Sequence, residues 1–219
     1  ELLRRPGRLS RPDRIAVILR GLPGAGKSRV ARTLRDIEVA NGGEAPRVLS
    51  MDDYFLQEVE VTKRCEETGR DVKESEMQYV FEAEMESIYK ASALKAFRRT
   101  VDEGLYKFLI VDAPNVRVED FHEYWSHAKT KGYEVFIFEV LADVDVCYNR
   151  NVHGRTKEDV YGLASEWEGC PHYMCKLTGL DKVLREDDLA ADDVEEVEMQ
   201  HEEEENPYAA VAAARGGGA

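Results

Sequence analysis

The segment Gly21–Ser28, with the sequence GLPGAGKS, constrains this chain more than any other feature, because it matches G-x-x-x-x-G-K-[S/T] at every fixed position. An apolar run, IAVIL at 15–19, precedes it, and a helical pattern follows from Lys27 to Ala40. In a strand–loop–helix unit of this kind, successive backbone N–H groups and the positive end of the helix face a phosphate. The sequence therefore predicts a nucleotide phosphate site made by Gly21, Leu22, Pro23, Gly24, Ala25, Gly26, Lys27 and Ser28.

Strand patterns and helix patterns alternate along the rest of the chain. Further strands are expected at 47–51, 108–111, 134–140 and 172–177, and further helices at 76–103, 116–131, 147–153 and 157–168. This alternation predicts an α/β fold, a P-loop NTPase three-layer sandwich of the small-kinase type with a parallel sheet of about five strands. In such sheets, ligands bind at the carboxyl ends of the strands.

The expected domain organisation has three parts. Residues 1–14 form a basic leader, 15–187 form the P-loop kinase-like domain, and 188–219 form an acidic, disordered tail that follows a last helix from Leu180. Within the domain, 56–75 is expected to be a mobile hairpin-like excursion, because residues 58–61 alternate and Gly69 marks a turn. The chain begins with Glu1, which suggests a piece of a longer protein.

Three carboxylates follow the predicted strands. Asp112 ends the run FLIV, where it is expected to hold Mg²⁺ together with the Ser28 hydroxyl, the alternative being an ordinary turn residue. Asp52 follows the strand at 47–51 and is the candidate base for an acceptor hydroxyl. Asp53 is the candidate for contact with metal-bound water, and a helix N-cap is the alternative for this pair.

Three cations complete the predicted machinery. Lys27 is expected to neutralise the β- and γ-phosphates, and Arg150 and Arg155 are expected to form a lid over the triphosphate. The alternative for the two arginines is a solvated helix end, which cations also favour. His153 is interpreted as structural, since no acyl-transfer nucleophile is placed near it.

Composition narrows the range of partners. The net charge of −14 argues against strong non-specific binding of nucleic acid, although a local basic cleft stays open, and no apolar run is long enough to cross a membrane. Of the four cysteines, Cys170 and Cys175 flank His172. A zinc site is open on residue types, but other ligands at the usual spacing are missing, which favours reduced thiols in a reducing intracellular compartment.

These motifs resemble the polynucleotide-kinase-like branch of P-loop kinases, through GLPGAGKS, SMDDYF, the strand-end DAPN and CxxRN. More closely, the chain resembles the C-terminal domain of the YLP motif-containing protein family, also called nuclear protein ZAP. The matching stretches lie between Ile15 and Met199 and include APRVLSMDDYF, YVFEAEME, AKTKGYEV, RNVHGR and EEVEM. The resemblance implies a nuclear setting associated with RNA, chromatin and phosphatase regulation, although no YLP repeat is present.

Two function classes remain open at this point. The first is a phosphotransferase that uses ATP or GTP with Mg²⁺ and phosphorylates a nucleic-acid 5′-hydroxyl of RNA or DNA, a nucleoside or another small alcohol. The second is a catalytically silent nucleotide-binding module that contacts protein partners of a nuclear complex. A GTPase switch is disfavoured, because the nearest base-reading candidate, TKGY at 130–133, lacks the aspartate.

Overall fold

The protein is described by a computed structural model that covers residues 7–64, 71–151 and 154–178. Its main sheet has five parallel strands in the order β2-β5-β1-β6-β7. These strands are β1 Ile15–Arg20, β2 Arg47–Ser50, β5 Phe108–Asp112, β6 Glu134–Glu139 and β7 Cys175–Lys176. The predicted α/β class is confirmed. The predicted helix from Leu180 and the acidic tail lie outside the described residues.

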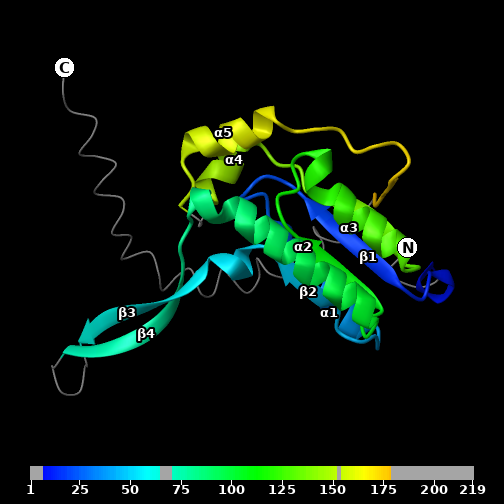
Figure 1. The fold of residues 1–219 in the computed structure, drawn as a ribbon, viewed down its shortest axis with the longest axis horizontal. Coiled ribbons are helices and arrows are strands. Elements are labelled where there is room, and N and C mark those ends of the chain that lie inside the picture. The colour runs from blue at the N-terminus through cyan, green and yellow to red at the C-terminus, as the bar shows by residue number, and fades with distance from the viewer. Residues whose placement is uncertain (1–6, 65–70, 152–153, 179–219) are drawn as a thin grey trace. The chain divides into compact units, whose positions relative to one another are not determined.

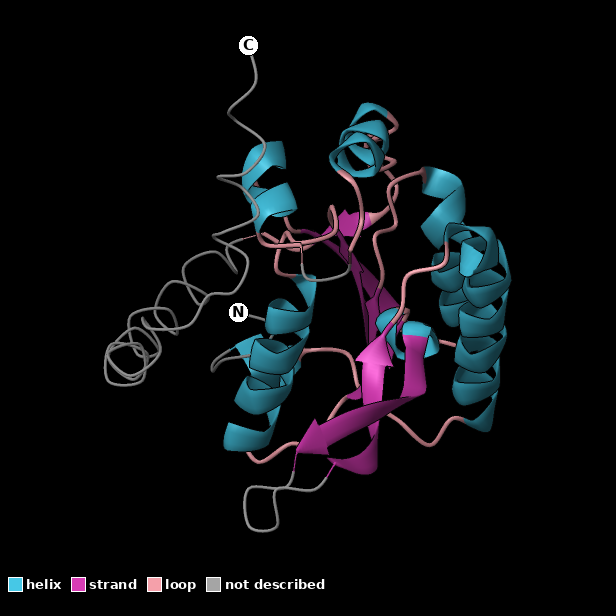
Figure 2. Cartoon of the chain, turned by 90° about the vertical axis from the view of Figure 1, so that its left-hand side faces the viewer, coloured by secondary structure: helices cyan, strands magenta, loops and turns pink. Residues whose placement is uncertain are grey.

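Helices cover both faces of this sheet (Figures 1 and 2). They are α1 Lys27–Ala40, α2 Glu86–Glu103, α3 Val118–Thr130, α4 Val144–Asn149 and α5 Lys157–Ser165. Ala16 and Ile18 of β1 pack in one buried cluster with Phe97 of α2 and Phe121 of α3. Ile15, Val17 and Leu19 of β1 are also buried and point to the opposite face, because successive strand residues alternate.

Two further strands, β3 Leu56–Arg64 and β4 Asp71–Tyr79, form a separate antiparallel hairpin. A hairpin thus lies where the sequence predicts a hairpin-like excursion over 56–75, and it extends to Tyr79, whereas its turn at 65–70 lies outside the described residues. The mobility predicted for this segment stays a prediction. Aromatic packing fixes its base, where Phe55 meets Tyr79 at 5.3 Å, Phe81 at 5.5 Å and Tyr89 at 4.9 Å between ring centroids.

The helix predicted over 76–103 is wrong in its first ten residues. Residues 76–79 pair with β3, a 3₁₀ turn follows at Ala83–Met85, and α2 begins at Glu86. The four-residue spacing between Met77 and Phe81 does not reflect a helix, since Met77 lies in a strand and its side chain is exposed. Gly104 ends α2 as predicted, with a left-handed φ of 64° and an N–H bonded to the Thr100 carbonyl.

Other limits shift by a few residues. The helix predicted over 147–153 is found as α4 at 144–149, because Asp143 caps it by accepting hydrogen bonds from the N–H groups of Asp145 and Val146. The strand predicted over 172–177 is reduced to Cys175–Lys176. None of the helices in the described ranges combines the length and apolar character that a bilayer crossing requires.

The described part of the leader contacts the domain. Arg8 and Arg11 both make paired hydrogen bonds, of 2.6 to 2.9 Å, to the carboxylate of Glu38 on α1. Glu38 is buried, and its pKa reflects two opposed effects. Burial raises this pKa, but the two guanidinium groups outweigh burial and lower it below the ordinary value. The limits predicted for the domain itself, 15 and 187, stay a prediction.

Candidate functional site

The loop Gly21–Ser28 leaves the carboxyl end of β1 and enters α1 at Lys27. Gly24 and Gly26 have φ values of 80° and 96°, in the region where only glycine is unstrained. A Cβ at Gly24 would also lie 2.0 Å from the Cys147 carbonyl oxygen of α4. Leu22 and Ala25 of the loop pack with Cys147, so apolar side-chain contacts also hold the loop against α4.

The start of α1 provides backbone donors for an anion. Gly26 precedes the helix without a side-chain cap, and the Val30 N–H makes the first bond of the helical ladder, 3.1 Å to the Gly26 carbonyl. The preceding N–H groups of the first turn therefore have no helical partner and carry the positive end of the helix dipole. They border a cavity of about 410 Å³ that Pro23, Gly24, Gly26, Lys27 and Ser28 help to line.

Lys27, Ser28 and Asp112 form the charged centre of this cavity. The Lys27 Nζ donates a 2.9 Å hydrogen bond to the Leu22 carbonyl, and burial lowers the pKa of Lys27, against Asp112 and Asp52, which raise it. Asp112, at the end of β5, accepts a hydrogen bond from the Ser28 hydroxyl. Burial raises the pKa of Asp112, while Ser28 and Lys27 act in the opposite direction.

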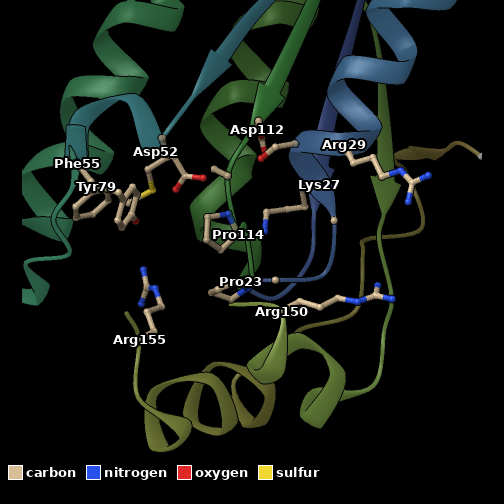
Figure 3. A pocket seen from close by; sticks show the side chains of 15 residues that line it. Pro23, Lys27, Arg29, Asp52, Phe55, Tyr79, Asp112, Pro114, Arg150 and Arg155 are labelled. Carbon is tan, nitrogen blue, oxygen red and sulfur yellow. The ribbon is translucent and has the colours of Figure 1, made fainter. Parts of the chain in front are cut away.

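Asp52 lies at the other wall of the same cavity (Figure 3). It opens the 3₁₀ turn Asp52–Phe55, and the N-cap position of that turn is taken by Met51 rather than by an aspartate. The Tyr79 hydroxyl donates a hydrogen bond to the Asp52 carboxylate, and burial followed by Asp52 raises the pKa of Tyr79. Asp53 instead lines a neighbouring cavity with Arg47, where burial and then Asp52 raise its pKa.

Both predicted lid arginines line the phosphate cavity, from opposite sides. Arg150 follows α4 next to Pro23, and Arg155 lies on the side of Phe55 and Tyr79 (Figure 3). Arg155 is buried, because its guanidinium stacks 4.0 Å from the Phe81 ring centroid and forms a 3.1 Å ion pair with Glu86. Arg155 is thus tied to α2.

Arg20, which no sequence motif singles out, fixes the strand ends around the site. Its fully buried guanidinium donates to the carbonyls of Asn115, Val116 and Glu168 at 2.7 to 2.8 Å and to the Glu139 carboxylate at 2.8 Å. Phe121 and Trp167 each lie 4.4 Å from it. This clamp joins the residue before Gly21 to the segment after Asp112.

Two further hydrogen bonds join the same two loops. The Gly21 N–H bonds the Pro114 carbonyl at 3.0 Å, and the Asn115 Nδ2 donates to the Leu19 carbonyl at 2.7 Å. Asn115 has a positive φ of 49°, a conformation that asparagine tolerates better than most residues. The motif DAPN at 112–115 is therefore a structural connection as well as the position of a carboxylate, a role that its sequence did not indicate.

The residues present fit a hydrated Mg²⁺ held together with phosphates. In the part of the chain that the structure describes, no group of three or more His, Cys, Asp or Glu side chains is arranged to hold a metal. Mg²⁺ commonly takes one or two protein oxygens and completes its shell with phosphate oxygens and water, and Ser28 and Asp112 supply that number. The same finding leaves Cys170, His172 and Cys175 without support as a zinc site.

Comparison with known proteins agrees with this geometry. The sequence profile described as AAA domain matches residues 17–165. YLP motif-containing protein 1 of Rattus norvegicus is 45% identical over 215 residues, which cover 94% of this chain and 16% of that protein. Its Homo sapiens namesake is 48% identical over 200 residues, which cover 91% of this chain and 9% of that protein. The predicted resemblance to this family is confirmed, and the chain spans less than a fifth of either relative.

One solved structure shows the fold independently of sequence. A candidate kinase from Chloroflexus aurantiacus is 13% identical, covers 81% of this chain and 98% of its own, and superposes with a TM-score of 0.50. At this identity the likeness concerns the fold alone. Together with the family match, it confirms the predicted P-loop NTPase fold of the small-kinase type.

Proposed function

The chain belongs to the AAA domain family, and from that premise we propose that it binds a purine nucleoside triphosphate with Mg²⁺ and transfers the γ-phosphoryl group to a hydroxyl. The observation that carries the proposal is the meeting of three elements in one cavity. The glycine-rich loop, the hydrogen-bonded pair Ser28–Asp112 and the carboxylate of Asp52 all border the same space. A site for binding alone has no need of the third element.

Each residue of the site has a distinct role in the proposed reaction. Lys27 and the N–H groups at the start of α1 hold the phosphates, while Ser28 and Asp112 would hold Mg²⁺, which neutralises phosphate charge when bound. Asp52 accepts the acceptor hydroxyl proton as that oxygen bonds to the γ-phosphorus. The bond between the γ-phosphorus and the β,γ-bridging oxygen breaks, and a nucleoside diphosphate leaves. Arg150 and Arg155 stabilise the charge on the transferred group.

A second candidate is a catalytically silent nucleotide-binding module of a larger nuclear regulatory protein. It is favoured by the net charge of −14 and by the small share of its relatives that the chain spans. Under this alternative, nucleotide would stabilise a surface for protein partners of an RNA- or chromatin-associated complex. For both candidates we propose a nuclear location, on the resemblance to the YLP motif-containing protein family.

The first experiment is calorimetric titration of the protein with ATP and with GTP in the presence of Mg²⁺. Lys27→Ala should weaken binding at least tenfold, roughly 1.4 kcal/mol, because it removes a buried charge-assisted contact to phosphate. Lys95→Ala is the matched control, since Lys95 is an exposed lysine on α2 that does not line the phosphate cavity. Lys27-independent binding would contradict the proposed site.

Asp52→Ala separates the two candidates. If Asp52 is the general base, Asp52→Ala should lower turnover by roughly 10²–10⁴-fold while the affinity for nucleotide stays nearly constant. Asp36→Ala is the control, since Asp36 is exposed on α1 and interacts with Arg35. Binding without turnover in the wild-type protein, across a panel of hydroxyl acceptors, would favour the silent module.

A further inference from the structure

A second cavity, of about 570 Å³, lies beside the phosphate cavity. The two share Met51, Ala113 and Pro114 as a common wall, and Met51 directly precedes Asp52. A molecule in the second cavity can therefore bring a hydroxyl to the boundary where the candidate base lies. The volume is within the range of pockets that hold small ligands.

Part of the lining of this second cavity is apolar. Ala91 and Leu94 come from α2, Val116 follows β5, and Leu163 comes from α5. The Tyr124 phenol adds an aromatic wall from α3, and burial raises its pKa to about 12, so it stays protonated at neutral pH. Such a wall suits a flat, weakly polar group such as a nucleobase.

The rim is dominated by carboxylates. It carries Lys90 and Arg117 as cations, and five acidic side chains, which are Glu86, Glu119, Asp120, Glu123 and Glu166. Carboxylates accept hydrogen bonds and donate none when ionised, so they suit a ligand rich in O–H and N–H groups. They also repel a ligand that carries phosphates of its own.

Both rim cations are already neutralised. Lys90 lies 3.0 Å from the Asp120 carboxylate and 3.7 Å from that of Glu86. Arg117 lies 3.1 Å from Glu119 and 2.9 Å from Glu166. A phosphate entering this cavity would have to separate these pairs before it found a cation.

The phosphate cavity has the opposite balance. Lys27, Arg29, Arg150 and Arg155 line it, against only two carboxylates, Asp52 and Asp112, so basic residues stay in excess even though Arg155 is paired with Glu86. Arg155 and Glu86 meet in an ion pair where the two cavities adjoin, and each lines a different one. Charge therefore divides the space into one half for a polyanion and one half for an uncharged partner.

We propose that the second cavity binds the phosphoryl acceptor, and that this acceptor is an uncharged hydroxyl compound of nucleoside size rather than the 5′ end of a nucleic acid. The inference rests on the proposed function and selects one acceptor class from those that the sequence leaves open. The base packs on Leu94 and Leu163, the sugar hydroxyls donate to the rim carboxylates, and the reacting hydroxyl lies at Asp52.

The test compares pairs of ligands that differ by one phosphate. Each of the four common ribonucleosides and its 3′-monophosphate, which retains the same 5′-hydroxyl, is titrated into the full chain by calorimetry without triphosphate. At least one nucleoside should bind, and roughly tenfold more tightly than its 3′-monophosphate, because the added charge faces paired cations and five carboxylates. Equal or tighter binding of the 3′-monophosphates, or no binding of any nucleoside, would overturn the proposal.

Variants locate the binding. Ala91→Trp should fill the cavity and reduce nucleoside affinity at least tenfold, whereas Lys95→Trp on the same helix should not, since Lys95 does not line the cavity. Glu119→Gln combined with Glu166→Gln removes the negative charge of both partners of Arg117 and should bring the 3′-monophosphate to near parity with the nucleoside. Retention of the tenfold preference in that double variant would contradict the charge argument.

Two controls keep this test separate from that of the proposed function. Glu103→Gln, in an exposed ion pair with Arg99 outside the cavity, should change neither affinity. ATP titration of every variant reports folding and the Lys27 site independently, so loss of phosphoryl transfer with intact nucleoside preference would reject the kinase and leave the binding site standing.

Discussion

Replacement of Arg20 by methionine is the most demanding test of how the site is held together. Methionine keeps an unbranched side chain of similar length but removes all the donors and the charge. It leaves the carbonyls of Asn115, Val116 and Glu168 without the bonds of 2.7 to 2.8 Å that the guanidinium supplies, although the Val116 carbonyl keeps the Glu168 N–H as a donor at 3.1 Å. Glu139 loses its 2.8 Å partner but retains Lys176 at the same distance.

The size of the loss follows from these contacts. An orphaned buried acceptor costs about 1–3 kcal/mol, and breaking a buried ion pair on one side costs about 3–5 kcal/mol. The terms are not additive, and Glu139 is only half deprived of partners, so we expect a loss of about 3–5 kcal/mol for Arg20→Met. Arg20→Lys keeps the charge but not the planar fork, and we expect about half that loss.

Equilibrium unfolding in urea at neutral pH, followed by circular dichroism, measures the effect. Arg35→Met is the control, since Arg35 is half-exposed with one 3.3 Å contact to Asp36, and it should change stability by less than about 0.5 kcal/mol. If Arg20→Met lies within about 1 kcal/mol of the wild type, the clamp between β1 and the segment after Asp112 is not a determinant of stability, and the reasoning fails.

Two further changes test the loop and the leader. Gly24→Ala should abolish measurable nucleotide binding in calorimetry, because its Cβ would lie 2.0 Å from the Cys147 carbonyl oxygen at a left-handed φ; binding at wild-type affinity would contradict the loop geometry. Glu38→Gln should destabilise the protein by about 1–3 kcal/mol at pH 7, because it weakens the pairing with Arg8 and Arg11. Since the folded pKa of Glu38 is lowered, its stabilisation is complete above the unfolded value of about 4.3 and is lost as pH falls through the folded pKa, so thermal melts of variant and wild type should converge in acid.

The sequence predicted best what depends on local physics. The phosphate loop and the limits of α1 at Lys27 and Ala40 follow from glycines, an apolar strand and helical periodicity within some 25 residues, and the structure has those limits. Asp112 was located by the same logic, because a parallel strand that ends in a carboxylate presents it at the ligand edge of the sheet.

The sequence could not predict what depends on distant contacts. Residues 76–79 carry a spacing that fits a helix, and only their pairing with β3 makes them a strand, which brings Tyr79 to Asp52. In the sequence, Arg20 is indistinguishable from an ordinary basic residue at a strand end, because the backbone carbonyls that it bonds lie 95 to 148 residues away along the chain. No local pattern encodes such a clamp.

The same distinction governs the choice of acceptor. A net charge of −14 is a weak argument against a nucleic-acid substrate, since a local cleft can still be basic. The second cavity does contain cations, but Arg117 lies between Glu119 and Glu166, and Lys90 between Asp120 and Glu86. Specificity would then follow from which cations are already paired rather than from how many are present. Preference for an uncharged acceptor is therefore a property that a pair of glutamate substitutions should be able to remove.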